Sequence, residues 1–135
     1  MNDKLKELLV ALEALRLLEH SLHLNATEYE LHLLFQRLYE PLVDEFDKVA
    51  EHFVSLGGVV DPRWIAERSV PVLKRWEKCE CCECALKAEE DLQILILATV
   101  KKSGDNLAVD NTLRGIADNH GTAIYLLRQA VKKSC

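Results

Sequence analysis

Aromatic residues, glycine and proline are all scarce in this chain. Aromatics make up 6% of its 135 residues, and there are only 5 glycines and 3 prolines. No segment alternates apolar and polar residues for long enough to predict a strand, and leucine dominates the 49% of residues that are hydrophobic. Leucine-rich segments with few turn residues favour helix-on-helix packing. The sequence therefore predicts an all-α protein with a single domain over residues 1–135.

Long apolar runs, a signal-peptide pattern and a basic arm are also lacking. The apolar run QILILATV falls far short of the ~20 residues that span a bilayer. The amphipathic start MNDKLKELLV carries no signal peptide, so we expect a cytoplasmic protein without a membrane partner. The net charge is −5, and each end of the chain carries few lysines. Because phosphate is neutralised by clustered basic residues, we expect DNA binding to be weak or absent.

Apolar residues recur at helical spacing in four long segments, with a short one between the second and the third. Thr27 and Glu30 form a capping box that predicts the start of the second helix, and Gly57 predicts its end. Pro41 should bend that helix or loosen one turn without dividing it. The ranges that we predict are about 2–24, 27–56, 62–68, 71–102 and 106–132.

Two histidines and two carboxylates carry most of the functional information: His20, His32, Asp47 and Glu51. Asp47 and Glu51 are four residues apart and share a helix face. His32 precedes Asp47 by fifteen residues, roughly 22 Å along a helix, so no single ion can touch both. His20 can fold back near His32. One chain therefore offers two half-sites, which a second chain packed antiparallel about a twofold axis would complete.

Imidazole and carboxylate together are a ligand set that suits iron. The alternative interpretation is that the carboxylates are solvated surface charges and the histidines are packing residues, as most such residues are.

The segment around these four residues resembles the Dps family of miniferritins. That family has a histidine in the first helix, a second histidine twelve residues later, and then D-x-x-x-E before L-G-G. His20 and His32 have this separation, and FDKVAEHFVSLGG supplies the remainder. The segment SGDNLAVDNTLRGIADNHGTAIYLLRQAV is similar to the family's last helix and the loop before it. The resemblance is weakest from Val60 to Ala88, and where the family often has an acidic ligand this chain has Gln36.

The resemblance implies a ferritin-like four-helix bundle with a short helix between the second and third long helices. It implies a ferroxidase that oxidises Fe(II) with peroxide or dioxygen at a site shared by two subunits, and that stores iron in a dodecameric shell. Asp105 and Asp110 would line pores, or would instead cap the fourth helix. Gln36 leaves one firm iron position per site. No E-x-x-H pair is present for an iron site within one bundle, which favours the intersubunit site.

Four cysteines within six residues, Cys79, Cys81, Cys82 and Cys84, lie where the resemblance is weakest. Structural disulfides are rare in the cytosol, and thiolates prefer zinc or copper(I). A zinc- or copper-sequestering helical protein is therefore the alternative function. Equally, some of these cysteines are small core residues and the rest are surface thiols, or exposed thiols consume oxidant near an iron centre.

Overall fold

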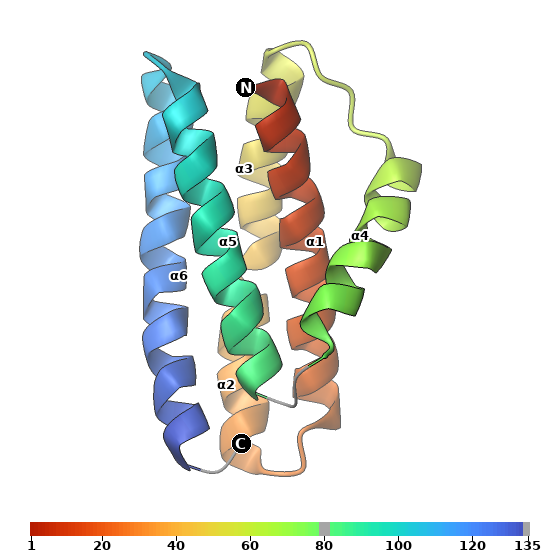
Figure 1. Cartoon of the computed structure of the whole chain (residues 1–135), viewed down its shortest axis with the longest axis vertical. Coiled ribbons are helices and arrows are strands. Elements are labelled where there is room, and N and C mark those ends of the chain that lie inside the picture. The colour runs from red at the N-terminus through yellow and green to blue at the C-terminus, as the bar shows by residue number, and fades with distance from the viewer. Residues whose placement is uncertain (79–81, 134–135) are drawn as a thin grey trace.

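The chain forms an all-helical structure in the computed structural model, which describes residues 1–78 and 82–133 (Figure 1). The helices are α1 (Asn2–Asn25), α2 (Tyr29–Tyr39), α3 (Leu42–Ser55), α4 (Pro62–Trp76), α5 (Cys82–Ser103) and α6 (Leu107–Lys133). The described residues contain no strand, so the predicted all-α class is confirmed. None of the described helices has a stretch that is long and apolar enough to cross a membrane.

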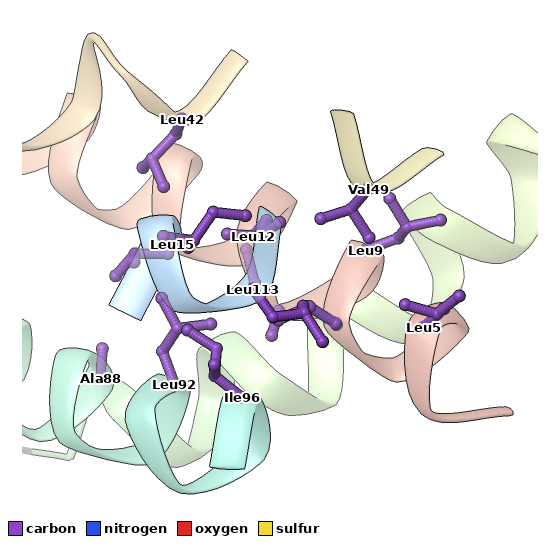
Figure 2. Packing of buried hydrophobic residues seen from close by; sticks show 14 of the residues in the cluster. Leu5, Leu9, Leu12, Leu15, Leu42, Val49, Ala88, Leu92, Ile96 and Leu113 are labelled. Carbon is purple, nitrogen blue, oxygen red and sulfur yellow. The ribbon is translucent and has the colours of Figure 1, made fainter. Parts of the chain in front are cut away.

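Four helical columns run side by side along the long axis of the molecule: α1, α2 followed by α3, α5 and α6 (Figure 1). α1 packs against α2, α3 and α5, and α6 packs against α5 and α3, while α4 lies against the outer side of α1. Leucine side chains from several columns point toward one another in the centre (Figure 2). Each column buries one stripe of apolar residues, which is why a leucine-rich sequence with few turns closes into this arrangement.

The second column is divided near Pro41, which corrects the expectation of one unbroken helix. α2 ends at Tyr39 and α3 begins at Leu42. Proline has no N–H to donate to the carbonyl of Arg37, so one turn loosens. Glu40 and Pro41 nevertheless keep right-handed helical dihedral angles, and Glu40 N–H still bonds to the Gln36 carbonyl. The two helices therefore continue in line.

The ends of this column only partly follow the prediction. The expected capping box is not formed, because α2 begins at Tyr29 after Glu28 and no side chain caps it. The other end is as predicted: Gly57 has φ +93°, and Gly58 N–H bonds to the Phe53 carbonyl at 2.9 Å. A left-handed residue at this position is the usual way to satisfy the last carbonyls of a helix.

The predicted boundary between the short helix and the third long helix is wrong. α4 continues to Trp76, and Pro71 lies inside it instead of starting the next helix. The start is as expected, because the Asp61 carboxylate accepts from Arg63 N–H at 2.9 Å and Pro62 occupies the first turn. At the start of α6, the Asn106 side chain accepts from Val109 N–H at 3.1 Å, which confirms the predicted cap.

Candidate metal centre

Three imidazole rings gather where α1 turns into α2. His20 and His23 lie on α1, one turn apart, and His32 lies on α2. The rings of His23 and His32 stack with their centroids 3.8 Å apart, and the ring of Tyr39 lies 4.5 Å from that of His20. His23 thus contacts His32 and lies beside His20, while the predicted proximity of His20 and His32 stays a prediction. His23 was not predicted, although its spacing of three residues from His20 places both on one helix face.

The hydrogen bonds of this cluster indicate which ring nitrogen of two imidazoles carries the proton. His23 Nδ1 lies 2.7 Å from the carbonyl oxygen of His32, and His32 Nδ1 lies 2.9 Å from the carbonyl oxygen of His23. A carbonyl only accepts, so each Nδ1 carries the proton in these bonds. Each neutral ring then has its lone pair on Nε2, which is the arrangement that metal-binding histidines usually adopt.

Asp47 and Glu51 form an exposed acidic pair on α3. Both side chains are exposed, and they line one shallow groove together with Ala50, Val54 and Ser55. Val43, 55% exposed, and Val54, 53% exposed, stand on the same helix face before and after the pair. A carboxylate pair framed by exposed apolar side chains suits a face that another protein surface covers.

The histidine cluster and the acidic pair lie on opposite sides of the Pro41 break. Among residues 1–78 and 82–133, no group of three or more His, Cys, Asp or Glu side chains is already spaced to hold an ion. Gln36, at the position where the resemblance would place an acidic ligand, donates its amide to Glu40 at 2.8 Å. The completion of the predicted site by a second chain stays a prediction.

The two aspartates predicted to guide cations are placed differently from each other. Asp105 is exposed in the turn before α6. Asp110 is half-buried and pairs with Arg114 one turn later, with 2.9 Å between Oδ2 and Nε. The helix cap comes from Asn106 and from neither aspartate.

Only part of the cysteine cluster belongs to the described structure, because Cys79 and Cys81 lie outside the described residues. Cys82 and Cys84 are both buried in the first turn of α5. Cys82 is disulfide-bonded, and a sulfur in a disulfide is not available as a thiolate ligand. The soft-metal alternative therefore needs this bond to be reduced first.

A second group of metal-ligating side chains, which the sequence reasoning missed, is buried between the four columns. Glu19 comes from α1, Glu45 from α3, Glu89 from α5 and His120 from α6, and each is at most 5% exposed. His120 Nδ1 lies 2.5 Å from Glu89 Oε2, and His120 Nε2 lies 2.9 and 3.0 Å from the two oxygens of Glu45. We call these four residues the bundle cluster.

Burial and mutual repulsion set the protonation of the bundle cluster. Burial raises the pKa of Glu19 well above its usual value, and the charge of Glu89, a hydrogen bond with Glu89 and the charge of Glu45 raise it further. Burial lowers the pKa of His120, but its bonds to Glu45 and Glu89 and their charges outweigh this and raise it to about 10. The raised pKa of Glu19 favours its neutral form, and a pKa of about 10 makes His120 a cation at neutral pH.

The carboxyl group of Glu19 is the least satisfied part of the bundle cluster. As a carboxylate, neither of its oxygens has a hydrogen-bond donor within reach, and Glu89 Oε1 also lacks one. Two facing carboxylates can share a hydrogen bond only when one holds a proton, which is the bond that raises the pKa of Glu19. The bundle cluster thus contains more carboxylate oxygens that accept hydrogen bonds than N–H or O–H groups that donate them.

A signal for the bundle cluster does exist in the sequence. Each of its members occupies a position where the apolar stripe of its helix should continue, for example Glu45 between Leu42 and Val49. An ionisable residue at a core position of every column is uncommon, because burying an unpaired charge is costly. The search for an E-x-x-H motif overlooked this pattern, since the ligands come singly from four helices.

A surface groove reaches the bundle cluster at the Pro41 break. This groove, about 240 Å³ in volume, is lined by Pro41, Glu45 and His120 together with neighbouring residues of α2 and α6. A larger groove of about 570 Å³ lies between α1, α4 and α5, but neither metal-ligating group lines it. The smaller groove is the one that matters for the bundle cluster, because it connects solvent with Glu45 and His120.

No protein-family model, curated protein or solved structure matches this chain. The resemblance to the Dps family therefore depends on the spacing of the four ligand positions and on the closing glycines.

Proposed function

We propose that this protein is a ferritin-like miniferritin that oxidises Fe(II) at sites shared by two subunits and stores the ferric product in a shell. The observation that carries the proposal is the orientation of His23 and His32, whose Nδ1 atoms are both engaged by backbone carbonyls. Their Nε2 atoms are left as ligands beside His20. A packing role for the histidines would not require both rings to keep the same nitrogen unprotonated.

The outer face of α2 and α3 supports the part of the proposal in which a second copy of this chain completes the site. Leu33 on α2 and Val43 on α3 are exposed, and they share a stripe with Asp47 and Glu51 along the two helices. The midpoint between His32 and the acidic pair falls at the Pro41 break. A twofold axis there would place the histidines of one chain against the carboxylates of its partner, twice in each dimer.

The donor set suits iron in both oxidation states. Carboxylates stabilise the higher charge of Fe(III), and imidazoles bind Fe(II) well. Fe(II) is the substrate, and each ion gives up one electron. Two electrons and two protons reduce one hydrogen peroxide to two waters as its O–O bond breaks. With dioxygen, the same two electrons and protons yield hydrogen peroxide. Carboxylate-lined inner surfaces would then nucleate the ferric mineral.

Fe(II) oxidation by hydrogen peroxide, followed by the absorbance of the ferric product, tests this function. We expect His32→Ala and Asp47→Ala each to slow the reaction by at least about tenfold, because each removes a ligand from every shared site. Asp44→Asn is the matched control: Asp44 is an exposed carboxylate one turn before the acidic pair, and its loss should leave the rate unchanged. Equal rates in the native chain and both ligand variants would refute the proposal.

A further inference from the structure

The bundle cluster is costly as a structural device. Three carboxylates and one imidazole, all nearly inaccessible to solvent, interrupt a core that consists mostly of apolar side chains, above all leucine. Well-packed apolar residues at such positions usually stabilise a protein as well as buried ion pairs do, or better. One oxygen of Glu89 and both oxygens of Glu19 gain no donor in return, apart from the bond that these two carboxyl groups share when one of them holds a proton. Structure alone does not account for this cost.

We propose that the bundle cluster is a second metal site, within each subunit, that binds one divalent first-row transition metal ion between Glu19, Glu45, Glu89 and His120. Three carboxylates with one imidazole form a donor set of intermediate hardness that suits Mn(II), Fe(II) and Co(II). Among the described residues, no basic or amide donor reaches the carboxyl group of Glu19, which faces only Glu89 within the cluster, so its oxygens can serve as ligands to an ion.

Binding requires a local rearrangement of the cluster. Both ring nitrogens of His120 are engaged by carboxylates, so an ion can bind only when one of these contacts opens. The cation then takes the place of one of the contacts through which His120 now joins Glu45 and Glu89. Because the ligands come from four separate columns, small rotations of side chains suffice and the helices need not move.

The groove at the Pro41 break provides the access route that a buried site needs. It is open to solvent and is lined by Glu45 and His120, the two members of the cluster that contact each other through Nε2. This site is separate from the intersubunit site, because none of its ligands belongs to the histidine cluster or to the acidic pair.

Mn(II) is the appropriate probe, because it prefers oxygen and nitrogen ligands and binds cysteine sulfur poorly. The titration uses the full chain carrying Asp47→Asn and Glu51→Gln, which disables the intersubunit site. Electron paramagnetic resonance measures free Mn(II). We expect saturable binding of about one Mn(II) per chain, as a single four-ligand centre requires.

Glu19→Gln, added to the same background, separates a metal site from a structural network. Glutamine keeps the shape and neutrality of the protonated Glu19 and can donate to Glu89, so the metal-free chain should stay folded, which far-UV circular dichroism checks. Loss of the carboxylate should weaken Mn(II) binding at least about tenfold. Glu67→Gln, at an exposed position on α4, is the control and should bind Mn(II) as the background chain does.

Two results would overturn the proposal: no saturable Mn(II) binding in the background chain, or the same affinity after Glu19→Gln. Neither result would affect the proposed ferroxidase, which is tested by His32→Ala and Asp47→Ala. Conversely, a protein that binds Mn(II) at the bundle cluster but oxidises Fe(II) equally fast with and without His32 would retain the inner site and lose the proposed function.

Discussion

Single residues determine the chemistry of this protein through their hydrogen bonds more than through their type. In the sequence, His23 and His32 cannot be told from packing histidines. The carbonyl bonds to Nδ1 are what favour their proposed role as ligands. His120 is the opposite case, since both of its ring nitrogens contact carboxylates.

The metal-free bundle cluster makes stability depend on pH. A pKa that is higher in the folded chain means that the folded state holds more protons, so stability falls as pH rises. For His120 the loss runs from its ordinary value of 6.5 up to about 10, and for Glu19 it begins above 4.5. Burial disfavours both charged forms, while Glu45 and Glu89 favour protonation from two other helices.

Urea unfolding at several pH values, with a chelator present, measures this effect. We expect the free energy of unfolding to fall between pH 6.5 and 10 by on the order of 4 kcal/mol. Glu19→Gln cannot ionise at position 19, so this variant should be more stable than the native chain at neutral pH. Its free energy of unfolding should also fall less than that of the native chain in the lower part of the range from pH 6.5 to 10. A free energy of unfolding that rises with pH would contradict the assigned protonation.

The helices show why elements were easier to predict than sites. The repeat of leucine along α1, and of Leu113, Ile116 and Leu127 along α6, is visible within one segment, because helical periodicity is a local property. The end of α4 differs from the prediction, because Pro71 lies inside this helix and does not start a new one. An exposed proline inside a helix removes one backbone bond without ending it when the flanking turns pack well.

The site was less predictable for a physical reason. The acidic pair lies within one turn of one helix, so its spacing was readable. The bundle cluster joins residues up to 101 positions apart, from Glu19 to His120, and these meet only through tertiary packing. Whether His32 meets Asp47 depends in turn on quaternary packing. Each further level of assembly brings together residues that the sequence does not place near one another.

Pro41 separates α2 from α3 and also lines the groove that leads to the bundle cluster. Its backbone and that of Glu40 already have helical dihedral angles. Pro41→Ala would return an N–H to the Arg37 carbonyl, and should raise the free energy of unfolding by about 1 kcal/mol. The restored turn should also narrow the groove and slow Mn(II) binding to the bundle cluster.

Chemical denaturation and stopped-flow Mn(II) uptake measure the two effects of Pro41→Ala. Pro62→Ala is the matched control, because Pro62 occupies the first turn of α4, where no helical N–H bond is lost. It should bring no gain in stability and no change in uptake. A Pro41→Ala chain that is less stable than the native chain would show that the break is required by packing at this junction.

At the scale of the whole molecule, the proposed function depends on assembly. In the proposed site, one chain of 15.4 kDa supplies two half-sites, the histidine cluster and the acidic pair, and neither is a ready metal site by itself among the described residues. Exposed apolar side chains along α2 and α3 favour burial of this face against a second copy. The bundle cluster, in contrast, is complete within a single chain. We therefore expect the oligomer to oxidise Fe(II) faster than the monomer. Both should bind Mn(II) at the bundle cluster with the same affinity.

Val43→Glu tests whether Fe(II) oxidation depends on assembly while Mn(II) binding does not. Val43 is 55% exposed and lies next to the break through which the proposed twofold axis passes, so the substitution would bring two carboxylates close together in each dimer. Light scattering after gel filtration should show the native chain at about twelve times 15.4 kDa and the variant at 15.4 kDa. The rate of iron oxidation should fall to that of His32→Ala while Mn(II) binding persists.

Val70→Glu is the matched control, because Val70 is 48% exposed on α4. It should preserve the size of the oligomer, the rate of iron oxidation and Mn(II) binding. A Val43→Glu chain that keeps its size and its rate would place the subunit contact on another face.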